Sequence, residues 1–154
     1  MKAYDPTDAV KRPQDSYHPN IEFSKVGIGF ANSNFKEEKY RTLSSLLEEN
    51  GDTEKTITYL KMDVEGAEFG CFEDWFETGI FTKVQQFGIE FHVSNKRVKN
   101  QVKFWFQKFN KYLGKLVHKY NFRIVDSKPN KCAGKREDGQ RTYYTFNDVL
   151  LIKS

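Results

Sequence analysis

The stretch Leu60-Lys61-Met62-Asp63-Val64-Glu65-Gly66-Ala67-Glu68 decides the fold, because it joins a buried strand directly to a helix. Residues 56–64 carry the apolar side chains of a buried strand. Residues 66–78 then place aromatic side chains at helical spacing, and Gly79 follows as a stop signal. A strand and a helix joined by a tight acidic turn are typical of an α/β sheet.

The rest of the chain continues the alternation of strands and helices. We expect strands at residues 2–4, 21–28, 84–93, 122–125 and 143–152, helices at 42–50 and 98–120, and loops at 31–39 and 127–141. This order favours an α/β domain with a mostly parallel sheet and an antiparallel C-terminal hairpin at one edge. No repeat or linker interrupts the chain, so we expect a single domain over residues 1–154.

The composition is that of a packed globular protein, with 38% hydrophobic and 16% aromatic residues. The net charge of +4 does not by itself indicate nucleic acid binding. Cys71 and Cys132 belong to no CxxC motif, so we expect no structural zinc site, and a disulfide between them stays open. No apolar run approaches the roughly 18–20 residues that span a bilayer, and no signal peptide is visible, so the compartment stays open.

The turn after residues 56–64 concentrates three carboxylates, those of Asp63, Glu65 and Glu68. Ligands of open α/β sheets bind at the carboxyl ends of the strands, which is where this turn lies. Gly66 permits a tight backbone path, and Glu68 suits the first turn of a helix. Helix caps favour the same residue types, so the spacing alone fits a capping role as well as a functional one.

The segment Lys61–Glu68 resembles the K-x-D-x-E-G-x-E signature of FkbM-type methyltransferases, and it is most similar to the animal methyltransferase-like proteins of that type. Further resemblances to that family lie at Tyr4-Asp5-Pro6, Val26-Gly27-Ile28-Gly29, Thr42-Leu43, Glu90-Phe91-His92 and Phe104-Trp105-Phe106. The resemblance implies a Rossmann-like class I sheet. It also implies methyl transfer from S-adenosylmethionine, most often to an oxygen of a small-molecule or glycan-like acceptor.

The resemblance also implies roles for individual residues. Asp5 matches the acidic residue that holds the ribose hydroxyls of the cofactor, a role that suits a carboxylate acceptor. Asp63 would border both the cofactor and the acceptor. An oxygen acceptor must lose a proton, and Asp63, Glu65 and His92 are the candidate bases.

Three carboxylates, Glu65, Glu68 and Glu90, would contact the acceptor. Structural roles for Glu90 and His92 at the end of a strand remain open. A carboxylate and histidine group of this kind can hold a divalent ion, but the spacing does not demand one, so we assign no metal site.

One feature of the family has no counterpart in this sequence, namely the first strand with its glycine-rich turn. Nothing before Asp5 supplies it, and Gly27-Ile28-Gly29 lacks the third glycine of a nucleotide-binding fingerprint. We therefore expect an N-terminally truncated domain that lacks its first strand, with exposed strand edges. We also expect this polypeptide alone to bind S-adenosylmethionine weakly or not at all.

The segment 96–119 is basic, with eight Lys or Arg residues and no Asp or Glu. It can be the solvated face of a helix that packs on the core. It can also bind anionic partners, which gives a second hypothesis of a non-enzymatic module that binds nucleic acid or an anionic membrane. For the methyltransferase itself we do not expect nucleic acid as a partner.

Overall fold

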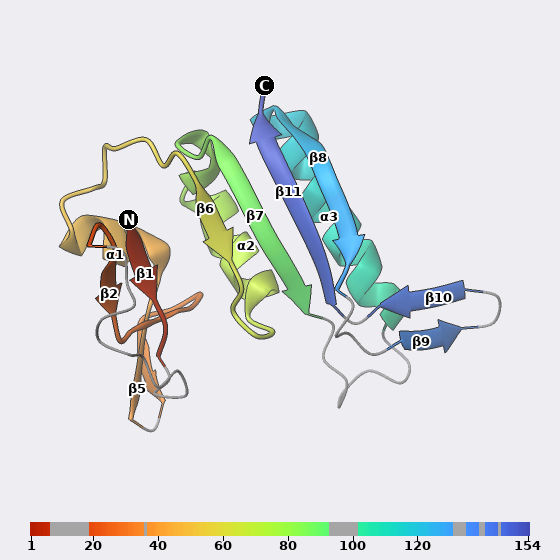
Figure 1. The fold of residues 1–154 in the computed structure, drawn as a ribbon, viewed down its shortest axis with the longest axis horizontal. Coiled ribbons are helices and arrows are strands. Elements are labelled where there is room, and N and C mark those ends of the chain that lie inside the picture. The colour runs from red at the N-terminus through yellow and green to blue at the C-terminus, as the bar shows by residue number, and fades with distance from the viewer. Residues whose placement is uncertain (7–18, 36, 93–101, 131–134, 139–140, 145) are drawn as a thin grey trace. The chain divides into compact units, whose positions relative to one another are not determined.

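The computed structural model describes residues 1–6, 19–35, 37–92, 102–130, 135–138, 141–144 and 146–154. The chain forms two compact units, an N-terminal unit (Met1–Thr53) and a C-terminal unit (Glu54–Ser154). Figure 1 shows the ribbon with its elements labelled. Each unit is described by itself, and the single domain over residues 1–154 stays a prediction.

The N-terminal unit contains two small sheets and one helix. Strand β1 (Lys2–Tyr4) pairs parallel with β2 (Glu22–Ser24). A second sheet has the order β3-β5-β4, from strands β3 (Gly27–Ile28), β4 (Ser33–Phe35) and β5 (Glu38–Arg41). The strand predicted at residues 2–4 is confirmed.

Helix α1 (Leu43–Glu49) ends the N-terminal unit and confirms the helix predicted at 42–50. Thr42 is its N-cap, because the Oγ1 atom of Thr42 accepts a hydrogen bond of 3.1 Å from the backbone N–H of Ser45. Leu43 and Leu46 are its buried residues, as their spacing predicts.

Two predictions in this unit are wrong. Residues 21–28 form two strands instead of one, since the N–H of Val26 donates to the carbonyl of Ser24 and turns the chain. Residues 31–39 are not a loop, because they contain β4 and the first half of β5. All three residues of β4 are exposed, so the strand has no apolar alternation that a sequence pattern could register.

The C-terminal unit is built on a four-stranded sheet with the order β6-β7-β11-β8. Its strands are β6 (Leu60–Met62), β7 (Gln86–His92), β8 (Phe122–Pro129) and β11 (Phe146–Lys153). Strands β6 and β7 are parallel, and β11 is antiparallel to both β7 and β8. The α/β class is confirmed, but the described sheets are small and mixed instead of mostly parallel.

The predicted antiparallel hairpin of the last strands at one edge of the sheet is confirmed. Strand β11 lies inside the sheet between β7 and β8, and β8 is the edge. Burial explains the order, because Val149 and Leu151 of β11 are buried, whereas only Phe122 of β8 is buried. Strand β8 also continues to Pro129, so the predicted loop at 127–141 begins too early.

Other boundaries in this unit differ from the predictions. The loop predicted at 127–141 also contains β9 (Lys135–Asp138), which forms an antiparallel hairpin with β10 (Arg141–Tyr144). The strand predicted at 143–152 is divided between β10 and β11. The strand predicted at 56–64 is regular only in β6, with an isolated bridge between Ile57 and Val84 before it.

Two helices cover one face of the four-stranded sheet, α2 (Glu68–Glu77) and α3 (Val102–Tyr120), as Figure 1 shows. They confirm the predicted helices at 66–78 and 98–120, of which residues 98–101 lie outside the described part. A short 3₁₀ turn, η1 (Ile80–Thr82), follows α2. No helix of the described residues is long and apolar enough to cross a membrane.

The core of this unit is aromatic. Its buried rings are those of Phe69, Phe72, Trp75, Phe76, Phe81, Phe87, Phe91, Phe109, Tyr112, Tyr120 and Phe122. The rings of Phe91 and Phe109 are stacked at 4.1 Å between centroids, which joins β7 to α3. Side chains alternate along a strand, so Phe91 faces the helices and its neighbour Glu90 faces the opposite side.

Candidate functional site

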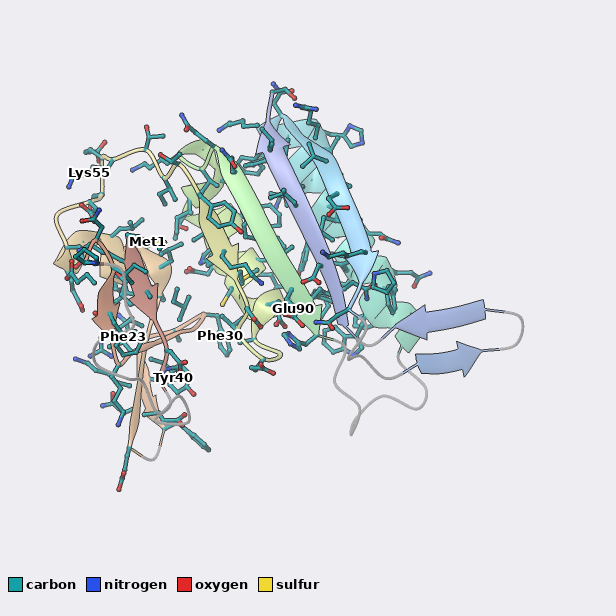
Figure 2. All side chains as sticks on the ribbon, in the orientation of Figure 1. Met1, Phe23, Phe30, Tyr40, Lys55 and Glu90 are labelled. Carbon is teal, nitrogen blue, oxygen red and sulfur yellow. The ribbon has the colours of Figure 1, made fainter. Side chains whose placement is uncertain are left out.

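Five of the six predicted site residues meet at the carboxyl ends of β6 and β7. These strands are parallel neighbours, so their carboxyl ends lie at the same edge of the sheet. Asp63 directly follows β6, and Glu90 lies near the end of β7, where Figure 2 labels it. We call the whole group the His92 cluster: Asp63, Glu65, Glu68, Glu90 and His92.

The turn between β6 and α2 positions the acidic side chains. Glu65 and Gly66 have φ values of 52° and 107°, and the N–H of Ala67 donates to the carbonyl of Val64. Two consecutive positive φ angles characterise a type I′ turn, for which Gly66 is suited. Glu65 is less suited, and such a conformation costs roughly 1–3 kcal/mol, a strain that is common at functional sites.

A buried carboxylate holds the imidazole of His92. The Oε1 atom of Glu68 lies 2.7 Å from Nδ1 of His92, and Glu68 is 0% exposed while His92 is 7% exposed. Since a carboxylate only accepts hydrogen bonds, Nδ1 carries the proton. The same Oε1 accepts the backbone N–H of Gly66 at 3.1 Å. Glu68 therefore fixes both the orientation of the imidazole and the path of the turn.

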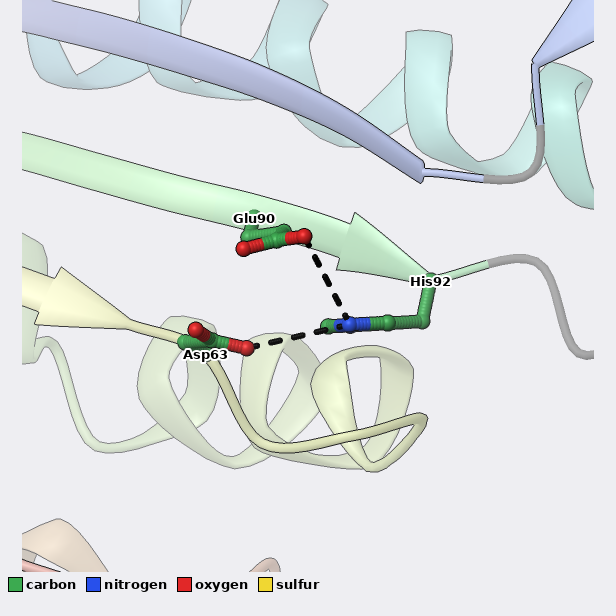
Figure 3. A group of neighbouring side chains, drawn as sticks. All are labelled: Asp63, Glu90 and His92. Carbon is green, nitrogen blue, oxygen red and sulfur yellow. Dashed lines mark ion pairs between the residues drawn. The ribbon is translucent and has the colours of Figure 1, made fainter. Parts of the chain in front are cut away.

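The other imidazole nitrogen faces the remaining carboxylates. The Nε2 atom of His92 lies 3.7 Å from Asp63 Oδ1, 3.6 Å from Glu65 Oε2 and 3.9 Å from Glu90 Oε1. These separations exceed the roughly 2.7–3.2 Å of an N–H···O hydrogen bond. Figure 3 shows Asp63, Glu90 and His92 directed toward a common point.

The charges around His92 raise its pKa. Burial by itself lowers the pKa of His92, but the hydrogen bond and charge of Glu68 outweigh it, with further contributions from Glu65 and Asp63. One positive charge also lies beside the cluster, because the Nζ atom of Lys61 lies 3.9 Å from Oδ2 of Asp63. The cluster is nevertheless strongly negative, and it suits a cationic or hydrogen-bond-donating ligand.

Two further residues, Lys61 and Asn130, contact this site, although the sequence assigns them no role. Lys61 belongs to the acidic-turn stretch but has no predicted function there. Asn130 donates from Nδ2 to Oε1 of Glu90 at 2.7 Å. Asn130 lies within residues 127–141, which the sequence predicts to be a loop, and no sequence signal links it to β7.

Asp5 belongs to the N-terminal unit, where its backbone N–H donates to the carbonyl of Ser24 at 3.2 Å. Its role in cofactor binding stays a prediction.

Two lysines of helix α3, Lys108 and Lys115, lie against aromatic rings of the core. Lys108 pairs with Glu73 at 2.7 Å, and the Nζ of Lys115 lies 4.1 Å from the centroid of the Phe76 ring. Residues 96–101 and the side chain of Lys103 lie outside the described part of the chain. The hypothesis of a module that binds anionic partners remains untested.

A comparison of the sequence with protein-family profiles shows to which family the chain belongs. The sequence profile of the methyltransferase FkbM domain matches residues 6–124. The chain belongs to the FkbM methyltransferase family. The matched part of this FkbM domain contains the whole His92 cluster, and the match begins directly after Asp5. The chain matches no curated protein and no solved structure significantly.

Proposed function

We propose that this FkbM domain transfers a methyl group from S-adenosylmethionine to an oxygen of a small-molecule or glycan-like acceptor. The proposal includes a Rossmann-like class I arrangement and a closeness to the animal branch of the family. The observation that carries it is the His92 cluster, which gathers a buried histidine and four carboxylates at the carboxyl ends of two parallel strands. Family membership supports the reaction class.

The chemistry of the cluster fits the cofactor. S-adenosylmethionine supplies an electrophilic methyl group on a positively charged sulfonium. The negative charge of the cluster suits such a cation, and Asp63 and Glu65 are exposed, so a ligand can reach them from solvent. In this proposal Asp63 contacts the methionine end of the cofactor, and Asp5 accepts hydrogen bonds from the ribose hydroxyls.

The residues of the chain then prepare the acceptor. A hydroxyl group becomes a nucleophile when a base accepts its proton. The candidate bases are Asp63, Glu65 and His92, and Nε2 of His92 lies 3.7 Å from an oxygen of Asp63 and 3.6 Å from one of Glu65. Glu90 orients the acceptor by accepting a hydrogen bond. Glu68 acts through His92 as a positioning residue, because it is fully buried. Its direct contact with the acceptor stays a prediction.

Cofactor binding tests this proposal without knowledge of the acceptor. Isothermal titration would compare S-adenosylmethionine binding to the protein as its gene encodes it and to its Asp63→Asn and Asp5→Asn variants. We expect each variant to bind about 10–100-fold more weakly, since each loses one charge-assisted contact worth roughly 1.5–3 kcal/mol. Asp126→Asn, an exposed carboxylate on β8, is the control. Equal affinity in all four proteins would contradict the assigned roles.

A further inference from the structure

Three side chains of the His92 cluster come together with the geometry of a metal site. One ligand atom each of Asp63, Glu90 and His92 lies within 4.8 Å of the other two. Divalent ions hold oxygen and nitrogen ligands at about 2.0–2.6 Å, so two ligands of one ion lie at most roughly 5 Å apart. The three atoms therefore surround a position that an ion can occupy, and Figure 3 shows them facing it.

The support of His92 is the second, independent observation. Histidines that bind metals usually donate their other ring N–H to a carboxylate, which fixes the tautomer and strengthens the ligand. Nδ1 of His92 makes this contact with Glu68 at 2.7 Å, so Nε2 is the nitrogen that faces Asp63 and Glu90. The Oε2 atom of Glu68 is buried, and among the described residues it has no hydrogen-bond partner. A fully buried carboxylate is costly, and a cation beyond the imidazole would lower that cost.

A hydrogen bond from a neighbouring side chain also supports the carboxylate of Glu90. Its Oε1 atom accepts a hydrogen bond from Asn130 at 2.7 Å, which restricts the carboxylate to one orientation. Asp63 is placed by the end of β6, one strand away from Glu90 and His92. Hydrogen bonds thus orient the side chains of Glu90 and His92, and the end of β6 places Asp63 beside them.

We infer that Asp63, Glu90 and His92 form a binding site for one divalent transition-metal ion of the Mn²⁺ type. Carboxylates are ligands that Mn²⁺ prefers, and an imidazole is a ligand that Fe, Ni, Cu and Zn ions prefer. Ca²⁺ is disfavoured because it binds oxygen ligands and not nitrogen. Glu65, 83% exposed at its side chain, stays outside this ligand set. It is then the group that remains to accept a proton from an acceptor.

The inference deepens the proposed function, because the site uses side chains that the proposed methyl transfer also uses, but its test needs neither cofactor nor acceptor. The test uses the metal-free protein as its gene encodes it. Mn²⁺ is added, and electron paramagnetic resonance measures the concentration of the unbound ion. We expect one bound Mn²⁺ per chain. Asp63→Asn, Glu90→Gln and Glu68→Gln should each weaken binding about 10–100-fold. Glu77→Gln, at the far end of α2, should leave it unchanged.

Pulsed resonance keeps the test sharp if a variant is destabilised, because it reports ligation in the wild-type protein. Bound Mn²⁺ should show a ¹⁴N coupling from a directly bound imidazole, and His92→Asn should abolish it while circular dichroism stays unchanged. Failure to bind Mn²⁺ at millimolar concentration would overturn the inference. So would binding that Asp63→Asn and Glu90→Gln leave intact, or bound Mn²⁺ without nitrogen coupling.

Discussion

The carboxylate of Glu68 and the imidazole of His92 form a buried pair, with 2.7 Å between Oε1 and Nδ1. One residue begins α2 and the other ends β7, so the pair joins a helix to the sheet at the site itself. In a low-dielectric interior such a contact is strong, and its loss leaves an unsatisfied polar group. This pair supports the other three side chains of the His92 cluster.

Removal of Glu68 should therefore be costly to stability. Glu68→Ala deletes the acceptor of His92 and the partner of the Gly66 N–H, so we expect a loss of about 2–4 kcal/mol in the free energy of unfolding. Glu77→Ala, an exposed residue on the same helix, should change it by less than about 0.5 kcal/mol. Urea unfolding followed by circular dichroism measures both, and equal effects would contradict a supporting role for Glu68.

The backbone of the acidic turn gives a second prediction. Gly66 has a φ of 107°, which other residues rarely adopt, and a Cβ atom there would meet nothing within 4 Å. Gly66→Ala should thus cost about 1–3 kcal/mol through backbone strain alone. Gly114, inside α3 and equally open, has no such strain, so Gly114→Ala should stabilise the protein by about 0.5–1 kcal/mol. Thermal melts that show the same sign for both variants would refute the assigned turn.

A pH dependence follows from the contact between α2 and α3. The ammonium of Lys108 and the hydroxyl of Tyr112 both donate to Glu73, and these bonds lower the pKa of Glu73. A depressed carboxyl pKa contributes stability above the unfolded pKa of about 4.3, and this is lost as pH falls through the folded pKa.

Lys108→Met should accordingly cost up to about 1 kcal/mol near neutral pH, because Glu73 is partly exposed and screened. The cost should be smaller at about pH 3 than near neutral pH, because the stability that a depressed carboxyl pKa contributes is lost as the pH falls below the unfolded value. Lys111→Met, an exposed lysine on the same helix, serves as the control. Urea unfolding at both pH values measures the difference, and a cost for Lys108→Met that does not change with pH would rule out the charge contact as its cause.

The thiol of Cys71 provides a probe of the core. Cys71 is a free, fully buried cysteine, and burial, with smaller effects of Glu68 and Asp74, raises its pKa to about 12. A thiol of this kind is unreactive, so iodoacetamide should label Cys71 only when urea unfolds the C-terminal unit. Peptide mass spectrometry without a reductant measures this. Labelling that requires a reductant would instead indicate a disulfide to Cys132, which lies outside the described residues.

The sequence predicts the site better than it predicts the sheets. Asp63 can be anticipated because a strong apolar pattern marks the strand before it and ligands bind at the carboxyl ends of strands, whereas Glu90 and His92 are indicated by the resemblance to the family. Strand β4 has only exposed residues and carries no such pattern. The insertion of β11 between β7 and β8 is a choice of tertiary partner, which depends on burial across the sheet and not on local residue order. The hydrogen bond from Asn130 to Glu90 is hidden for the same reason.

Methyl transfer itself tests the central claim most directly. The protein as its gene encodes it would be incubated with S-adenosylmethionine carrying a labelled methyl group and with fractionated small molecules and glycans. We expect label on an acceptor oxygen, lost by about 100-fold or more in Asp63→Asn and retained in Asp126→Asn. If no fraction accepts the label, or if Asp63→Asn transfers it as fast as the wild-type protein does, the His92 cluster is not the active site of a methyltransferase.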